Sequence, residues 1–348
     1  MNGLLFSGIK KLTFTETPDP TIVEAGDVIL KLELAGICGS DLHPYHGREE
    51  GLDLGTVMGH EGVGTIVEVG KSVRSLKKGD RVFVPFTSNC GGCFYCERGL
   101  TCRCSSGQLF GWVEKGRGLH GLQGEYSRIP FADSTLMKVP EGVKAEEALL
   151  LGDVFSTGRF SAEMAGVSEE GTFVVLGCGP VGLASILNAK VMGATSVFAV
   201  DTIAERLEKA VLFGATAIDF KKQNVKALVL EETDGRGADG VIEAVGSAAA
   251  ERLGMDLVRP GGTLCVTGVH TDKAYSFSPV EAYNKNLIYK TGRCPARYYA
   301  EKLLPLVREK RWGIDRLITH RFPLKEGAFA YQVFDEKRDA CIKAVLTT

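Results

Sequence analysis

The sequence has almost no net charge and no long uninterrupted hydrophobic run. Its formal net charge is -2 over 348 residues, so it lacks the basic surface that binds nucleic acids or acidic membranes. Residues 171–189 carry no charged side chain, but three glycines and a proline interrupt them, which favours a strand, a turn and a helix over a membrane span. The first residues show no basic segment followed by an apolar one. We therefore expect no nucleic-acid partner, no membrane span and a cytoplasmic location.

The sequence also lacks internal repeats and low-complexity segments. Its length exceeds what a single hydrophobic core usually supports. The length of 348 residues therefore predicts two domains, and hydrophobic residues at 44% and charged residues at 24% are ordinary for a globular protein. Ten cysteines could indicate disulfides. The Cys-x-x-Cys-x-x-Cys cluster and the missing secretion signal instead favour thiolates on a metal in a reducing compartment.

Hydrophobic patterning divides the chain into a strand-rich part and a part in which strands and helices alternate. In the first 150 residues, Val28–Leu34 alternates apolar and polar side chains, and residues 62–69 and 81–84 are rich in Val and Ile. The later part alternates short apolar strands with helical patterns, as in a parallel, doubly wound sheet. The strands are predicted at residues 172–176, 195–200, 215–218, 240–245 and 263–267. After about residue 295 we predict a helix over 298–308 and a closing strand over 340–346.

A glycine-rich loop follows the first strand of the alternating part. It reads Gly177-Cys178-Gly179-Pro180-Val181-Gly182, and Asp201 lies 19 residues after Gly182, at the end of the next strand. These glycines allow a tight turn, close approach of a pyrophosphate, and packing of helix on strand, while the helix N-terminus offers N–H groups to phosphates. Asp201 would bind ribose hydroxyls and repel a 2′-phosphate, which favours NAD over NADP. Arg206 argues mildly the other way, since a cation tolerates a phosphate.

Two groups of residues have the composition of zinc sites. Four cysteines lie close together in a glycine-rich stretch, at Cys90, Cys93, Cys96 and Cys104. Four thiolates complete a tetrahedron around zinc, which is typical of a structural site. Cys38 and His60, each flanked by glycines, would be ligands of a second zinc. With a polar third ligand from elsewhere, that zinc keeps one open position for chemistry.

Together these motifs resemble the zinc-dependent medium-chain alcohol dehydrogenases. The resemblance extends over essentially the whole chain and rests on Gly59-His60-Glu61, the cysteine lobe, Ser156-Thr157-Gly158 and the glycine loop. It implies an α/β fold with a Rossmann cofactor domain and a β-rich, GroES-like catalytic domain formed by both chain ends. The implied domains are residues 1–153 with a structural zinc lobe at 88–106, residues 154–295 for NAD binding, and residues 296–348 completing the catalytic domain.

The resemblance also implies a catalytic site. It places the third zinc ligand at Asp153, where better-known members carry Cys and some relatives that act on secondary alcohols, threonine or formaldehyde carry an acid. A carboxylate is a harder ligand than a thiolate but has the same formal charge, so zinc remains reasonable. Glu61 resembles an acid behind the metal that either enters the coordination sphere or stays beside it. Ser40 and His43 match the family's proton relay, although His43 could also be an ordinary packing residue.

In the implied reaction, zinc lowers the pKa of a bound alcohol, and the alkoxide passes a hydride to NAD to give an aldehyde or ketone. Further cofactor contacts are implied at Thr157, Val181, Gly268 and Val269. Candidate pocket walls, which could equally be core, are Phe86, Leu109, Phe110 and Trp112. Gly39 stands where some members carry a phosphate-binding Arg, which implies easier NAD release. The expected assembly is a homodimer or homotetramer with two zinc ions per chain.

Several readings compete with a general alcohol dehydrogenase. Motifs such as Gly152-Asp153-Val154-Phe155 resemble the formaldehyde dehydrogenase-like branch, and a polyol or amino-alcohol dehydrogenase on the same scaffold is the alternative. A zinc-ribbon interaction module would have no use for the glycine loop or Asp201. A zinc-free quinone reductase would lack the set formed by Cys38, His60 and Asp153.

Overall fold

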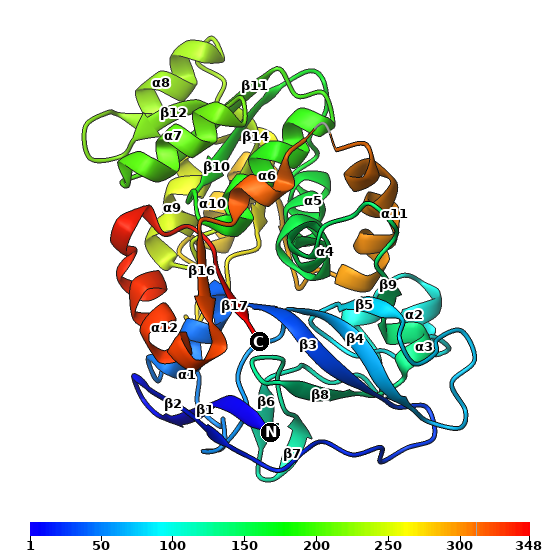
Figure 1. Ribbon diagram of the computed structural model, residues 1–348. Coiled ribbons are helices and arrows are strands. Elements are labelled where there is room, and N and C mark those ends of the chain that lie inside the picture. The colour runs from blue at the N-terminus through cyan, green and yellow to red at the C-terminus, as the bar shows by residue number, and fades with distance from the viewer. Residues whose placement is uncertain (311) are drawn as a thin grey trace. The chain divides into compact units, whose positions relative to one another are not determined.

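The computed structural model describes residues 1–310 and 312–348, which form two compact units (Figure 1). The first unit comprises Met1–Ser156 and Pro295–Thr348, and the second comprises Thr157–Cys294. Both chain ends therefore belong to the first unit, and the second is inserted between them in the sequence. The predicted domain limits after residues 153 and 295 stay predictions.

The first unit is built on a seven-stranded sheet with the order β16-β17-β3-β4-β5-β9, in which β8 also pairs with β3. Strand β3 alternates buried apolar residues with exposed Lys31 and Glu33, so one of its faces lies in the core. Strand β17 runs antiparallel to β3 and parallel to the edge strand β16, between the two. The strands are β3 Val28–Gly36, β4 Gly62–Val69, β5 Arg81–Val84, β8 Tyr126–Ile129, β9 Met137–Lys138, β16 His320–Pro323 and β17 Ala344–Thr347.

Two short antiparallel pairs and several helices complete the first unit. The pairs are β1 Asn2–Gly8 with β2 Lys11–Glu16, and β6 Trp112–Glu114 with β7 Arg117–Leu119. The helices are α1 Leu42–Tyr45, α2 Phe94–Glu97, α3 Ala132–Thr135, α4 Ala145–Gly152, α11 Ala296–Arg308 and α12 Gly327–Glu336. The 3-10 turns are η1 Gly39–Asp41, η2 Thr101–Arg103, η3 Ile314–Leu317, η4 Leu324–Glu326 and η5 Arg338–Ala340.

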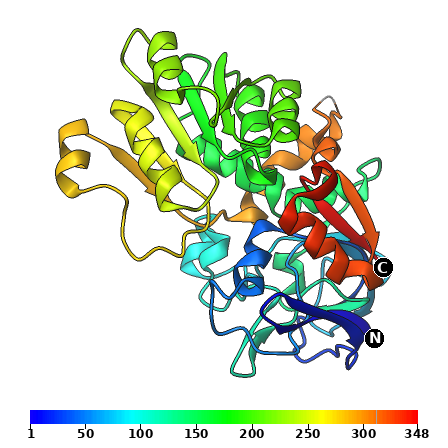
Figure 2. The same cartoon turned by 90° about the vertical axis from the view of Figure 1, so that its left-hand side faces the viewer.

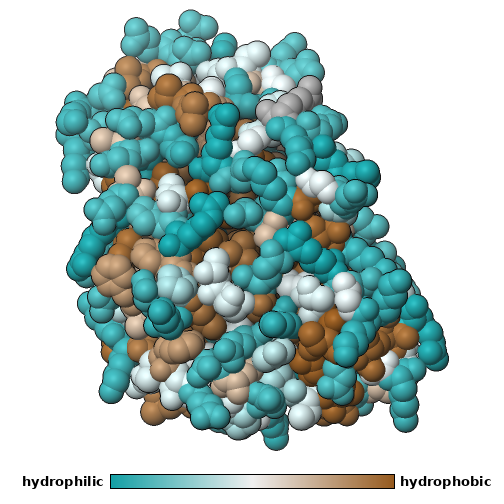
Figure 3. Space-filling view, in the orientation of Figure 1, coloured by the Kyte–Doolittle hydropathy of each residue, from teal (hydrophilic) through white to brown (hydrophobic). Residues whose placement is uncertain are grey.

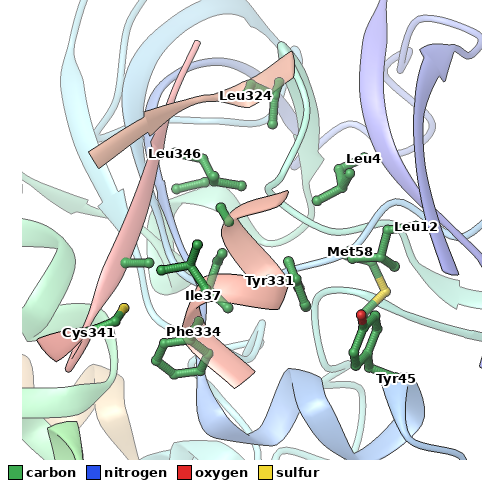
Figure 4. Packing of buried hydrophobic residues seen from close by; sticks show 14 of the residues in the cluster. Leu4, Leu12, Ile37, Tyr45, Met58, Leu324, Tyr331, Phe334, Cys341 and Leu346 are labelled. Carbon is green, nitrogen blue, oxygen red and sulfur yellow. The ribbon is translucent and has the colours of Figure 1, made fainter. Parts of the chain in front are cut away.

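Helix α12 covers one of the buried clusters of this unit (Figure 4). Tyr331 and Phe334 of α12 pack there with Ile37, which follows β3, and with Leu346 of β17. The closing strand begins at residue 344, not at 340 as predicted. Residue 340 ends η5, and residues 341–343 lie outside helices and strands, with the Lys343 side chain pointing into the protein.

The second unit contains a six-stranded parallel sheet with the order β12-β11-β10-β13-β14-β15. All five residues of β10 are buried, as expected for a strand covered on both faces. Figure 2 shows helices on both sides of this sheet, so the predicted doubly wound arrangement is present. The strands are β10 Thr172–Leu176, β11 Ser196–Asp201, β12 Thr216–Asp219, β13 Ala238–Glu243, β14 Val258–Val266 and β15 Ile288–Thr291. The helices are α5 Val154–Met164, which begins in the first unit, α6 Pro180–Val191, α7 Ala204–Leu212, α8 Val225–Glu232, α9 Ala248–Leu257 and α10 Pro279–Lys285.

The strand order places a switch in winding direction between β10 and β13, which are neighbours in the sheet but not in the sequence. Ligands of open α/β sheets bind outside the carboxyl ends of the strands at such a point. On the face drawn in Figure 3, hydrophobic residues are interspersed among a majority of polar ones, as on most globular proteins. Over residues 1–310 and 312–348, no helix has the length and apolar character needed to cross a bilayer.

Candidate metal centres and cofactor site

Four side chains from three stretches of the first unit meet at one point, and this group of Cys38, His60, Glu61 and Asp153 is called here the metal set. Each of Cys38, His60, Glu61 and Asp153 offers a ligand atom within 4.8 Å of the others. Asp153 Oδ2 lies 3.5 Å from Cys38 Sγ and 3.5 Å from His60 Nε2. Cys38 follows β3, His60 and Glu61 precede β4, and Asp153 ends α4. Ligand atoms around a tetrahedral zinc lie about 3.3–3.8 Å apart, given bonds of about 2.0–2.3 Å, so these spacings fit the metal.

The chemistry of this set also fits a cation. Burial and the neighbouring Asp153 carboxylate raise the pKa of the Cys38 thiol, while His60 opposes them less strongly. A thiolate and a carboxylate side by side in a buried position are costly without a compensating positive charge. A divalent cation between them removes that cost.

Asp41 fixes the geometry of two of these residues, and the sequence reading missed it. Its Oδ1 lies 3.0 Å from His60 Nδ1, and its Oδ2 accepts a hydrogen bond of 2.9 Å from the Cys38 backbone N–H. A carboxylate on one imidazole nitrogen orients the ring so that the other nitrogen faces the metal. The available signal was an acid three residues after a candidate cysteine ligand, inside one short turn.

Glu61 and Lys343 form an ion pair in which both side chains are 0% exposed. Lys343 Nζ donates to Glu61 Oε1 at 2.6 Å and to the backbone oxygen of Ile37 at 2.9 Å. Burial raises the pKa of Glu61 to about 7 against the opposing effect of Lys343. Among the described residues, buried Glu61 Oε2 has no hydrogen-bond partner. A Cβ at Gly36 would lie 2.0 Å from this oxygen, so the site needs glycine there.

The four cysteines predicted to bind a structural zinc lie close together. Cys90, Cys93, Cys96 and Cys104 offer sulfur atoms within 4.8 Å of one another, and all are free thiols. The Cys93 and Cys96 sulfurs are 3.5 Å apart. Backbone N–H groups, first that of Cys96, lower the pKa of Cys93 to about 5, which favours the thiolate that zinc binds. Cys102 lies in the same stretch but is buried in the core.

The predicted relay residues lie on the short helical segment after Cys38. Ser40 Oγ is 3.4 Å from His60 Nε2, so its hydroxyl lies beside the metal set. His43 stands on α1, where burial, and to a smaller extent Arg48 and His46, lower its pKa. His43 Nδ1 is buried with no hydrogen-bond partner in the part of the chain that the structure describes.

The four candidate pocket residues have different surroundings. The Phe86 ring lies 6.2 Å from the His60 ring in an edge-on arrangement, so Phe86 borders the metal set. Phe110 is almost fully buried in a core cluster with Val28 and Leu30. Leu109 and Trp112 are half-buried. Contact of any of these residues with a substrate stays a prediction.

The glycine loop of the second unit has the geometry of a phosphate cradle. Strand β10 ends at Leu176, and α6 begins at Pro180 directly after Gly179. Gly177 has φ +88, which favours glycine, and a Cβ at Gly182 would lie 1.8 Å from the Gly177 oxygen. The loop therefore requires glycine at these positions, and the first turn of α6 presents its N–H groups at the edge of the sheet.

Asp201 ties this loop to the end of β11. Its Oδ2 accepts the Cys178 N–H at 2.7 Å, and its Oδ1 accepts N–H groups from Thr202 and Ile203 at 2.6 and 3.0 Å. A carboxylate has about four acceptor positions, so it can still bind ribose hydroxyls. Arg206 Nη1 lies 3.9 Å from Asp201 Oδ2, and its buried Nε has no partner within the described residues.

The remaining cofactor candidates also lie in the second unit. Thr157 is on α5 and Val181 is on the first turn of α6, while Gly268 and Val269 follow β14. The sequence reading missed Val245, an exposed apolar residue just after β13 that contacts the glycine loop. Its Cγ2 would lie 2.7 Å from a Cβ at Gly177.

Comparisons with known proteins show which family the chain resembles over its whole length. A family model described as alcohol dehydrogenase GroES-like domain matches residues 24–141, and one described as zinc-binding dehydrogenase matches residues 180–308. Zinc-type alcohol dehydrogenase B of Aspergillus flavus is 40% identical over 344 residues, which cover 96% of this chain and 79% of that protein. NADP-dependent isopropanol dehydrogenase of Clostridium beijerinckii is 32% identical over 92% of both chains. The structure of alcohol dehydrogenase TADH from Thermus sp. ATN1 matches 100% of both chains, with 35% identity and a TM-score of 0.95.

Proposed function

Because the chain belongs to the zinc-dependent medium-chain alcohol dehydrogenase family, we propose that it oxidises alcohols reversibly with NAD, using Cys38, His60 and Asp153 as the catalytic zinc ligands. The predicted family, the combined Rossmann and GroES-like fold, and activity as a zinc-dependent alcohol dehydrogenase are confirmed. Zinc and a nicotinamide cofactor follow from the family. The ligands, the number of zinc ions, the choice of NAD and the substrate are the proposal.

One observation carries the metal assignment: ligand atoms of three residues lie at the spacing of a tetrahedral zinc, in a buried group that needs a cation. Three protein ligands leave one position for the substrate oxygen. When bound, zinc supplies Lewis-acid polarisation of that oxygen, and NAD accepts the hydride. Cys90, Cys93, Cys96 and Cys104 would hold a second, structural zinc.

The other residues of the site act on orientation and on the proton. Asp41 holds the His60 ring and the Cys38 backbone in place. Ser40, whose hydroxyl faces the metal set, accepts the alcohol proton, and His43 passes it towards solvent. Glu61 is held by Lys343 through Oε1, and its Oε2, which has no hydrogen-bond partner within the described residues, would be available to bind zinc transiently.

NAD is the proposed cofactor because Asp201 ends β11, where its carboxylate would bind the ribose hydroxyls of NAD and repel the 2′-phosphate of NADP. Arg206 is the opposing feature, since its guanidinium lies beside the same acid. One relative is named an NADP-dependent isopropanol dehydrogenase, so membership of the family alone does not decide between NAD and NADP. Gly39 removes one cation from the phosphate contacts, so we expect fast cofactor release.

We propose a homodimer formed through the edge strand of the parallel sheet. Strand β15 ends the strand order and pairs with β14 on one side. Its Ile288 is exposed, and none of the residues of the adjacent helix α10 is buried, with Tyr283 at 82% exposure. An open strand edge that exposes an apolar residue can pair with a second copy of the chain. Light scattering of the purified protein should give twice the mass of one chain, and Ile288→Lys should lower the measured mass towards that of a single chain.

The deciding experiment combines metal analysis with an NAD-linked panel of primary and secondary alcohols, polyols and amino alcohols. We expect about two zinc ions per chain, of which Cys38→Ser loses one together with activity. Turnover that survives removal of zinc by a chelator, or a fully active Cys38→Ser variant, would contradict the proposal. Activity confined to sorbitol or threonine would favour the alternative, a polyol or amino-alcohol dehydrogenase.

A further inference from the structure

A fully buried carboxylate stands at the end of β13, beside the switch in strand order. Glu243 Oε1 accepts hydrogen bonds of 2.8 Å from the backbone N–H groups of Val245 and Gly246. Its backbone oxygen accepts the N–H groups of Thr267 and Gly268 at 2.9 and 3.0 Å. A single residue therefore fixes both loops that follow β13 and β14, residues 244–247 and 267–270, called here the paired loops.

The second carboxylate oxygen of Glu243 is bound from the far end of the paired loops. His270 Nε2 lies 3.2 Å from Glu243 Oε2, and His270 Nδ1 lies 3.5 Å from Asp272 Oδ2. An ionised carboxylate can only accept, so Nε2 is the donor in this hydrogen bond. Burial raises the pKa of Glu243, and hydrogen bonds from Gly246, Val245 and His270 oppose this effect.

The backbones of the paired loops lie so close together that no side chain fits between them at Gly246 or Gly268. Gly246 has φ +80, and a Cβ there would lie 2.4 Å from the Val269 backbone oxygen. A Cβ at Gly268 would lie 2.2 Å from the Gly246 nitrogen and 2.7 Å from Glu243 Oε2. Glu243 binds N–H groups of both loops at the place where their backbones approach this closely.

The paired loops present two exposed valines next to the glycine loop. Val245 is 55% and Val269 is 49% exposed, although both are apolar. Val245 leans over Gly177, where the glycine loop begins. The N-terminus of α6 suits the charged pyrophosphate of a dinucleotide. The neighbouring surface is apolar and has backbone polar groups beside it, which suits a flat ring that carries an amide.

We propose that Glu243 and His270 are positioning residues for the nicotinamide half of the dinucleotide. They hold the paired loops in the conformation that places Val245, Val269 and the adjacent backbone against the ring. This inference rests on the proposed function, in which a nicotinamide cofactor occupies the carboxyl edge of the parallel sheet. Stability alone does not explain the pair, because an apolar side chain of similar volume fills a buried position without the cost of desolvating a carboxylate.

Calorimetric titration with NADH and with ADP-ribose, which lacks the nicotinamide, tests the inference. We expect His270→Ala and Glu243→Gln to weaken NADH binding by about tenfold while ADP-ribose binding changes by less than about twofold. The matched control is Glu251→Gln, because Glu251 is also buried in this unit but binds Tyr289 and the Ser276 backbone. The control should bind both ligands as the parent does.

The split between the two ligands separates positioning from folding. Equal affinity of His270→Ala and the parent for NADH would overturn the inference, and so would an equal loss of affinity for both ligands, which indicates a damaged unit. His270→Gln keeps a side-chain donor and should recover part of the NADH affinity, and it provides the same comparison if His270→Ala does not fold. A parent that binds neither ligand would instead overturn the cofactor assignment itself, whereas an active, NADH-binding parent with unaffected variants overturns this inference alone.

Discussion

Replacing Lys343 with Met tests whether the buried ion pair behind the metal set is structurally required. Lys343 and Glu61 are both 0% exposed and are joined by a hydrogen bond of 2.6 Å. Methionine keeps most of the side-chain volume but leaves the Glu61 carboxylate buried without its cation. Burial already raises the pKa of Glu61, so loss of the opposing charge makes the ionised form still less favourable.

The expected effect is large because one partner remains. Removing one member of a buried pair costs about 3–5 kcal/mol. In a domain of 150–250 residues, each kcal/mol moves Tm by about 2–4 °C, so Lys343→Met should lower the Tm of the first unit by about 6–20 °C. The double variant Glu61→Gln with Lys343→Met leaves no orphaned charge and should recover much of this loss.

Differential scanning calorimetry of the metal-loaded protein measures these shifts. The matched control is Lys144→Met, which removes a lysine from a solvent-exposed pair with Asp315 at 2.7 Å and should change Tm little. A Lys343→Met variant that melts no earlier than the Lys144→Met control would refute the reasoning. A double variant that melts as early as the single one would show that the loss arises from packing and not from an unpaired charge.

Four further outcomes follow from the site. Cys104→Ser should lose one of about two zinc ions and melt earlier, as metal analysis and calorimetry would show. Asp201→Gly should raise the ratio of kcat/KM for NADP over NAD by about tenfold, and an unchanged ratio would contradict the role of this acid. Gly36→Ala should cost about 1–3 kcal/mol in denaturant unfolding, because the new Cβ would lie 2.0 Å from Glu61 Oε2. Burial lowers the pKa of His43, so its ring is neutral at neutral pH and can accept a proton. The value of kcat/KM for alcohol oxidation should therefore fall as the pH drops through this lowered pKa, and His43→Gln should abolish this fall at acidic pH.

The fold was predictable where the chain repeats a simple period. A strand buried on one face alternates apolar and polar residues, and a strand buried on both faces is apolar throughout. The first pattern identifies β3, and the second identifies β10, β11 and β14. The glycine loop was equally readable, since its steric contacts exclude other side chains at Gly177 and Gly182.

The site was less predictable because its members come from distant parts of the chain. Asp153 has no local pattern that marks a ligand and was placed only by resemblance to the family. Lys343 was missed because a lone lysine in a closing apolar segment is usually on the surface, whereas here it turns inward to an acid far away in the sequence. Glu243 was missed for a similar reason, since its partners lie in two loops whose proximity only the sheet order reveals.

The pairing of β17 with β3 has a consequence for the order of events during synthesis. The stretches that carry Cys38, His60 and Glu61 are translated before the inserted unit, but β17, which borders β3, and Lys343, which neutralises Glu61, are translated after it. The inserted unit, Thr157–Cys294, is completely translated before then and contains its own sheet. Nascent chains should therefore complete the sheet of the inserted unit before β17 can pair with β3 and before Lys343 can pair with Glu61.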